Sequence, residues 1–414
     1  MPDATTGADG RDGTLRTVKA LLLESIHPLA ESILRDAGFE VETRTGALDE
    51  SELVDALQGV DVVGLRSKTE ITPAVLEKTQ LTAIGAFCIG TNQIALGEAA
   101  ARGIATFNAP FSNTRSVVEL AIGEIIAMAR RLTEKDSALH KGVWDKNSKG
   151  AHEIRGRKLG IVGYGNIGSQ LSVVAEMLGL QVFFYDTDDK LALGNAHRCD
   201  SLDELLETAE VITLHVDGRS GNAGFFGAEQ FARMRPRSLF LNLSRGFVVD
   251  YDALRDNLLS GHIAGAAVDV FPTEPKRRGE AFESPLQNIP NVILTPHVGG
   301  STEEAQEDIG RFVASKLRDY IDRGTTTLSV NLPSLSLEER PGGHRITHLH
   351  RNTPGVLAKV NSILAEHDVN IDGQLLNTRG ENGYVVTDVA QLPDAAVTAL
   401  REMPETIQLR VIAE

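Results

Sequence analysis

The feature that most constrains this chain is a glycine-rich segment between an apolar run and a helical pattern. Residues 163–168 are GYGNIG, Leu159–Val162 precede them as an apolar strand, and Ser169–Met177 continue with helical periodicity. In this context the glycines allow a tight turn and close approach of the backbone to a pyrophosphate at the helix N-terminus. The predicted cofactor-binding residues of this segment are Gly163, Gly165, Asn166, Ile167 and Gly168, of which Asn166 and Ile167 would direct their N–H groups at the anion.

Asp186 adds a second element of the same prediction. It ends the next apolar strand, 18 residues after Gly168. A carboxylate there accepts hydrogen bonds from ribose hydroxyls and repels a 2′-phosphate, which favours NAD over NADP. The simpler alternative, glycines that serve only a strand-to-helix turn, does not account for Asp186.

Strand and helix patterns alternate along most of the chain, as parallel sheets require. One series fills the first hundred residues, and a second, from Lys158 to Thr295, contains six expected strands. A helix at Val117–Arg131, with Glu124 on its exposed side, is expected to cross between the two domains, and the amphipathic helix Glu303–Arg323 to return to the first domain. The last 70 or so residues follow the order β-α-β-β-α-β of a ferredoxin-like module.

The predicted fold is therefore α/β, with two doubly wound parallel-sheet domains and a smaller C-terminal βαββαβ domain. The first domain is discontinuous because its last helix follows the second sheet. The expected bounds are 16–112 with 301–331, 113–300, a linker rich in Pro and Gly at 332–343, and 344–414.

Composition limits the partners. The 41 basic and 57 acidic residues give a net charge of −16, which disfavours binding to nucleic acid or anionic membranes. Two cysteines are too few for a disulfide framework or a Cys-based zinc site, which favours a reducing, cytoplasmic location. We expect no export signal, membrane span or metal site; His348 and His350 alternate along one strand and are expected to share a face.

Three polar residues follow three strands of the second sheet, at the edge where ligands bind such sheets. They are Arg245, Glu274 and His297. For oxidation of an alcohol, His297 is suited to take the hydroxyl proton, Glu274 to orient it and favour its charged form, and Arg245 to bind a substrate carboxylate. Any one of them alone could be an ordinary surface charge.

The chain resembles the D-isomer-specific 2-hydroxyacid dehydrogenase family, in particular its ACT-domain-bearing branch. The matching segments are Arg66–Thr69, Phe87–Gln93, Asn108–Ser116, Gly163–Gly168, Ser244–Gly246, Asp269–Pro275 and Thr295–Thr302. The resemblance implies the same catalytic roles for Arg245, Glu274 and His297. It also implies that Asp269 meets the carboxamide of the nicotinamide, within a set formed by Leu243, Ser244, Arg245, Asp269, His297, Val298, Gly299 and Gly300.

Substrate recognition is expected from the first domain, across a cleft. The expected set is Arg66, Ser67, Lys68, Ile89, Gly90 and Arg245, together with Lys146, whose loop also holds Trp144 and in similar enzymes approaches a neighbouring subunit. Arg66 is the strongest candidate for a phosphate. Lys68 and Arg115 could equally be ordinary exposed basic residues, and Trp144 could be structural.

The resemblance implies NAD-dependent oxidation of D-3-phosphoglycerate to 3-phosphooxypyruvate, the first step of phosphorylated L-serine biosynthesis. It further implies a homotetramer inhibited by L-serine between paired ACT domains, bound by His350, Asn352 and Asn370. Alternatives are another D-2-hydroxyacid dehydrogenase, including a 2-oxoglutarate reductase, and, more remotely, an NAD-sensing corepressor. The chain departs from the family pattern at Asp217 (commonly Pro), Leu243 (often a small residue) and Asp368 (often Gly).

Overall fold

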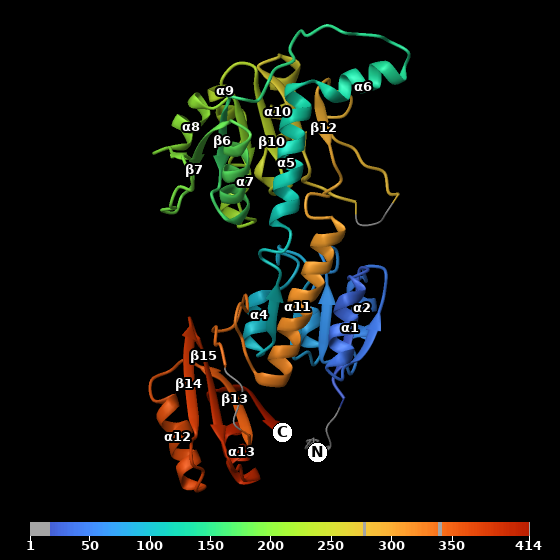
Figure 1. Ribbon diagram of the computed structural model, residues 1–414. Coiled ribbons are helices and arrows are strands. Elements are labelled where there is room, and N and C mark those ends of the chain that lie inside the picture. The colour runs from blue at the N-terminus through green and yellow to red at the C-terminus, as the bar shows by residue number, and fades with distance from the viewer. Residues whose placement is uncertain (1–16, 276–278, 338–341, 414) are drawn as a thin grey trace, which may run out of the picture. The chain divides into compact units, whose positions relative to one another are not determined.

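The computed structural model describes residues 17–275, 279–337 and 342–413, which form two compact units (Figure 1). One unit contains the chain up to Ala109 and from Gly310 onward, and the other is Pro110–Ile309. Residues 1–16 and residues 338–341 of the expected linker lie outside the described residues. Among the helices described, none is both long and apolar enough to cross a membrane.

The first unit contains a parallel five-stranded sheet with the order β2-β1-β3-β4-β5. Its strands are β1 (Lys19–Leu22), β2 (Glu40–Thr43), β3 (Val62–Leu65), β4 (Ala83–Ala86) and β5 (Ala105–Asn108). Its helices are α1 (Pro28–Asp36), α2 (Glu50–Ala56), α3 (Pro73–Glu77) and α4 (Leu96–Ala101), joined by α11 (Glu303–Arg323). The sheet and α11 approach closely at Gly85, where a Cβ atom would lie 2.8 Å from Leu317 Cδ1.

The second unit contains a parallel seven-stranded sheet with the order β12-β11-β10-β9-β6-β7-β8. Its strands are β6 (Lys158–Val162), β7 (Gln181–Tyr185), β8 (His197–Arg198), β9 (Val211–Leu214), β10 (Ser238–Asn242), β11 (Ile263–Val268) and β12 (Val292–Leu294). The six-strand expectation missed β8, because this edge strand has only two residues and both are polar and exposed.

Helices cover both faces of the seven-stranded sheet. They are α5 (Thr114–Ala129), α6 (Leu132–His140), α7 (Asn166–Met177), α8 (Leu202–Thr208), α9 (Ala228–Arg233) and α10 (Tyr251–Leu259), with short 3-10 turns at Ser220–Asn222 and Gly246–Val248. Helices α5 and α7 pack in one apolar core (Figure 1), whereas α8, α9 and α10 pack in a second. Two separate cores on one sheet define the predicted doubly wound architecture.

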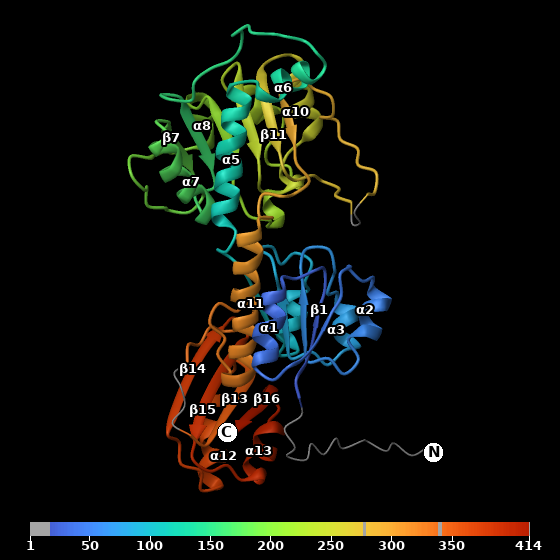
Figure 2. The same ribbon diagram turned by 45° about the vertical axis from the view of Figure 1, so that its right-hand side comes forward.

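The C-terminal part of the first unit is an antiparallel sheet with the order β14-β15-β13-β16. Its elements are β13 (His344–Arg351), α12 (Val356–Glu366), β14 (Gly373–Arg379), β15 (Asn382–Val389), α13 (Asp394–Arg401) and β16 (Thr406–Ala413) (Figure 2). Both helices share an apolar core with the sheet. This is the predicted ferredoxin-like order.

The sheet also contacts the C-terminal end of α11. The Arg410 guanidinium lies 4.7 Å from the Tyr320 ring centroid and donates to the Ile321 carbonyl at 2.7 Å. The Tyr384 hydroxyl donates to the Gly324 carbonyl, also at 2.7 Å. Side chains of this sheet therefore donate hydrogen bonds to backbone carbonyls at the end of α11 and just after it. These bonds connect the antiparallel sheet to α11.

Glu124 is buried, so the expectation that it lies on the exposed side of its helix was wrong. It follows Ala121 by three residues and precedes Met128 by four, which places it on the apolar face of α5. Only 4% of the residue is exposed, and neither carboxyl oxygen has a hydrogen-bond partner among the described residues. Burial, and to a lesser extent the charge of Asp269, raises the pKa of Glu124 to about 8.

This buried acid predicts a specific pH dependence of stability. Because the pKa of Glu124 is higher in the folded than in the unfolded chain, its contribution to stability is complete below pH 4.5 and is lost as the pH rises to about 8. Glu124→Gln removes this loss, so the variant should gain on the order of 3 kcal/mol over the parent between pH 5 and pH 8 in denaturant unfolding. Parallel pH profiles would contradict this. Glu119→Gln, an exposed change on the same helix, is the matched control.

Candidate functional site

The glycine-rich loop leaves β6 at the point where the strand order of the seven-stranded sheet reverses, between β6 and β9. Gly163 has φ = 91°, and a Cβ atom on it would lie 2.7 Å from the His215 carbonyl oxygen. A Cβ on Gly168 would lie 2.2 Å from the Gly163 carbonyl oxygen, whereas one on Gly165 would meet nothing within 4 Å. Two glycines thus close the turn, and the third leaves open space.

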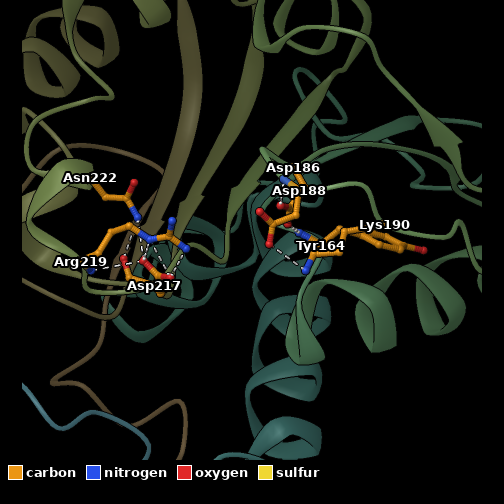
Figure 3. Close-up of polar contacts among 7 residues, drawn as sticks. All are labelled: Tyr164, Asp186, Asp188, Lys190, Asp217, Arg219 and Asn222. Carbon is orange, nitrogen blue, oxygen red and sulfur yellow. Dashed lines mark hydrogen bonds and ion pairs between the residues drawn. The ribbon is translucent and has the colours of Figure 1, made fainter. Parts of the chain in front are cut away.

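That open space suits a pyrophosphate. Helix α7 begins at Asn166, its N-cap Gly165 offers no side-chain cap, and first-turn N–H groups such as those of Asn166 and Ile167 have no partner within the helix. Asp186 follows β7, and its carboxylate accepts hydrogen bonds from the backbone N–H groups of Tyr164 at 2.7 Å and Asp188 at 2.9 Å (Figure 3). The residues present therefore fit a dinucleotide.

Glu274 and His297 meet at the carboxyl edge of this sheet. The Nδ1–H of His297 donates to Glu274 Oε2 at 2.8 Å, and Glu274 Oε1 accepts from the Phe271 N–H at 3.0 Å. Burial opposes ionisation of Glu274, but the His297 hydrogen bond and charge, the Phe271 N–H and the Arg245 charge together lower its pKa. With Nδ1 occupied, Nε2 is the His297 nitrogen that remains for proton transfer.

Asp269 holds the loop that carries His297. Only 2% of the Asp269 residue is exposed. Its carboxylate accepts hydrogen bonds from Thr295 Oγ1 at 2.6 Å and from the N–H groups of Val298 and Gly299 at 2.8 Å each. His297 itself has φ = 55°, a left-handed conformation that is costly for a residue other than glycine. The Asp269 hydrogen bonds on both sides of it stabilise this conformation. Sequence reasoning gave Asp269 a cofactor contact and missed this function.

Arg245 occupies the turn after β10. Its Nη1 donates to the Ser244 carbonyl at 2.7 Å, and its own carbonyl accepts from Asn242 Nδ2 at 3.1 Å. A Cβ atom on Gly246 would lie 1.9 Å from the Phe271 carbonyl carbon, so only glycine allows this turn to lie against the loop that leads to Glu274. Leu243 and Ser244 are buried beside it, the latter hydrogen-bonded to Asn242 Oδ1 at 2.7 Å.

The predicted substrate residues Arg66, Ser67 and Lys68 follow β3 in the first unit, again at the point where strand order reverses. The buried Glu24, which follows β1, accepts from the N–H groups of Lys68 at 3.1 Å and Thr69 at 2.8 Å. The sequence gave no sign of this role for Glu24. The Arg66 carbonyl accepts from Gln93 at 2.6 Å, while its guanidinium pairs with no described residue.

Ile89 and Gly90 follow β4 with their carbonyl groups turned into the protein. The Ile89 carbonyl accepts from Asn108 at 2.6 Å and that of Gly90 from Gln93 at 3.2 Å. Their N–H groups donate to none of the described residues. Two backbone donors are thus available to an anion.

The remaining predicted contacts are exposed. Lys146 and Trp144, the latter 81% exposed, lie in the loop after α6, where Lys135 pairs with Asp145 at 2.6 Å. Arg115 forms an exposed pair with Glu119 at 2.6 Å, within α5. A hollow beside this loop is lined by Arg131 and by Arg237, which precedes β10, so it lies away from the carboxyl edge of the sheet.

The predicted serine residues lie in or beside the antiparallel sheet. His350 lies within β13, an interior strand, and only 3% of it is exposed. Asn370 precedes β14, which begins at Gly373, and its side chain donates to Asp372 Oδ1 at 3.2 Å. Asn352 contacts the Gly380 carbonyl at 3.3 Å. The His350 Nε2 is buried without a partner among the described residues, and Asp368, with φ = 55°, has a conformation typical of glycine.

His348 and His350 do share a face, with ring centroids 5.3 Å apart. Burial, and to a lesser extent the charge of His350, lowers the pKa of His348 to about 4. Across the described residues, no group of three or more His, Cys, Asp or Glu side chains is arranged to hold a metal ion.

Comparison with known families and proteins gives consistent matches. Residues 122–299 match the D-isomer specific 2-hydroxyacid dehydrogenase NAD-binding domain, and residues 346–408 match the AHAS small subunit-like ACT domain. The chain is 49% identical over 400 residues to D-3-phosphoglycerate dehydrogenase of Escherichia coli strain K12, covering 95% of this chain and 97% of the relative. It is 45% identical over 397 residues to the protein of the same name from Dictyostelium discoideum, covering 95% and 97%.

Solved structures show the same fold. A putative D-isomer specific 2-hydroxyacid dehydrogenase from Polaromonas gives a TM-score of 0.69 at 26% identity, covering 77% of this chain and all of that one. D-lactate dehydrogenase from Aquifex aeolicus, solved with NAD and lactic acid, gives 0.65 at 25% identity, covering 73% and 95%.

Proposed function

The chain belongs to the D-3-phosphoglycerate dehydrogenases of the D-isomer specific 2-hydroxyacid dehydrogenase family, and we propose that it oxidises D-3-phosphoglycerate to 3-phosphooxypyruvate with NAD. This reaction would be the first step of phosphorylated L-serine synthesis. The observation that carries the proposal is the Glu274–His297 pair at the carboxyl edge of a sheet whose glycine loop fits a dinucleotide.

The reaction needs a base for the hydroxyl proton and an anchor for the carboxylate. His297 Nε2 takes the proton, and Glu274 holds Nδ1–H and stabilises the imidazolium that forms. Arg245 binds the carboxylate beside the reacting carbon. NAD, when bound, accepts the hydride. The nicotinamide contacts that we propose are Leu243, Ser244, Asp269, Val298, Gly299 and Gly300.

The substrate phosphate requires cations. We assign this role to Arg66, with Ser67 and Lys68 beside it, and to Lys146 of a neighbouring subunit. The free N–H groups of Ile89 and Gly90 are assigned to the carboxylate. The Arg66 guanidinium, which pairs with none of the residues that the structure describes, and the hydrogen-bonded carbonyls of Ile89 and Gly90 support these assignments.

A homotetramer is the assembly that we propose, and two exposed apolar surfaces support it. Leu132, Leu139, Val143 and Trp144, on α6 and its loop, are between 55% and 81% exposed. The edge strand β14 exposes Leu375 at 49% and Leu376 at 42%. Pairing through both surfaces would join four chains. Cys88 and Cys199 form no disulfide, which supports action in the reducing cytoplasm.

A substrate panel tests the proposed reaction. NADH formation is followed with D-3-phosphoglycerate, other D-2-hydroxyacids and 2-hydroxyglutarate. The highest kcat/KM is expected for D-3-phosphoglycerate. A higher value for another acid would favour a different dehydrogenase, and no turnover with any of them would favour a corepressor that only senses NAD.

His297→Asn is expected to lower kcat by roughly 10²- to 10⁴-fold, because a general base contributes that much to rate and little to cofactor affinity. NADH binding, measured by fluorescence titration, should remain near that of the parent. Equal losses in turnover and NADH affinity would contradict the role of His297 as the base.

Glu274→Gln is expected to move the acidic limb of the kcat/KM profile for alcohol oxidation to lower pH. The carboxylate favours protonated His297, and oxidation requires the neutral ring, so loss of the charge extends activity toward acid. An unchanged limb would count against the pairing that the 2.8 Å contact indicates.

L-Serine is expected to inhibit the parent by binding between paired ACT domains. His350→Ala and Asn370→Ala should abolish the inhibition while uninhibited turnover survives, because both residues lie in the C-terminal domain rather than beside His297. Inhibition is measured by NADH absorbance and serine binding by calorimetry. Absence of serine binding to the parent would refute this regulation.

A further inference from the structure

The loop after β9 carries a polar cluster that the proposed catalytic roles do not use. The Asp217 carboxylate accepts from Arg219 Nε at 2.8 and 3.0 Å and from Arg219 Nη2 at 2.6 Å (Figure 3). The same carboxylate accepts from Asn222 Nδ2 at 2.9 Å and from the Arg219 N–H at 3.2 Å. The Asp217 carboxylate therefore occupies the Nε and Nη2 edge of the Arg219 guanidinium.

This loop lies at the position where the sheet binds nucleotides. It follows β9, the strand beside β6 at the reversal of strand order, and the His215 carbonyl lies against Gly163 of the glycine loop. Arg219 therefore shares the carboxyl edge of the sheet with Asp186, the residue proposed to bind the adenosine ribose.

The electrostatics connect the cluster to both ends of that site. The Asp217 hydrogen bond and charge raise the pKa of Arg219, as do, more weakly, the charges of Asp188 and Asp186. The pKa of Asp217 is lowered mainly by Arg219 and, more weakly, by the charge of Arg245. The guanidinium and Asp186, the proposed ribose-binding residue, thus carry opposite charges at the same edge of the sheet.

We propose that Asp217 determines cofactor specificity by holding Arg219, which would otherwise bind a 2′-phosphate on the adenosine ribose. This inference rests on the proposed NAD site. A guanidinium binds phosphate through the same two-pronged geometry that it uses for a carboxylate, so an arginine engaged by Asp217 is less available to a phosphate. Asp186 repels the 2′-phosphate directly, and Asp217 withholds the cation that could offset that repulsion.

The test compares binding of NADH and NADPH, which differ only in the 2′-phosphate, to the full chain by calorimetry. Asp217→Asn should lower the ratio of the NADPH to the NADH dissociation constant about tenfold, the effect expected of one charge-assisted hydrogen bond. Adding Arg219→Gln should reverse this change. The same pair of variants in an Asp186→Ser background keeps NADPH binding measurable if the parent binds it too weakly.

Asp188→Asn is the matched control, because it removes one negative charge beside Asp186 but leaves the Asp217 carboxylate that holds Arg219. Any change that it causes should persist when Arg219→Gln is added. The inference would be overturned if Asp217→Asn left the ratio of the two dissociation constants unchanged. It would also be overturned if Asp217→Asn lowered the ratio equally when Arg219→Gln is present. Failure of the parent to bind NADH would instead refute the proposed function.

Discussion

The buried carboxylate of Asp269 accepts the hydrogen bonds on which the geometry of the loop around His297 depends. It accepts three hydrogen bonds from residues on both sides of His297, and these hold His297, the proposed base, in a left-handed conformation. Such a conformation costs about 1–3 kcal/mol, a cost that several charge-assisted hydrogen bonds can offset. The same negative charge acts on Glu124 in the neighbouring core, where burial and Asp269 together favour the protonated acid.

Both doubly wound sheets use carboxylates in a similar way. Glu24 binds backbone N–H groups at the reversal point of the five-stranded sheet, and Asp186 does so at that of the seven-stranded sheet. Each carboxylate fixes the loop that follows a strand at the reversal point. Glu24 and Asp186 are thus bound by local N–H groups, and the proposed anion sites of this acidic chain, with its net charge of −16, rest on Arg66 and Arg245.

The sequence predicted the layers of the fold because they follow from periodicity, and it suggested the proposed catalytic residues because each of them follows the end of a parallel strand. Arg245, Glu274 and His297 each follow a strand of one sheet, so their proximity could be expected without coordinates. Contacts that depend on tertiary packing could not be predicted from the sequence. Charge alone suggested that Glu124 is exposed, although its spacing from Ala121 and Met128 places it on the buried face.

In the C-terminal domain, too, the sequence predicted a strand but not the tertiary contacts that the strand makes. The pattern predicted β13, but not that both faces of this strand are covered. His350 and Ile346 lie on one face, the latter in the core with α12, and Arg345 lies on the other, donating to the Arg323 carbonyl at 3.1 Å. One face of β13 thus carries His350, the proposed effector-binding residue, and the other face contacts the end of α11. A displacement of β13 would therefore alter the surroundings of His350 and the contacts with α11 together.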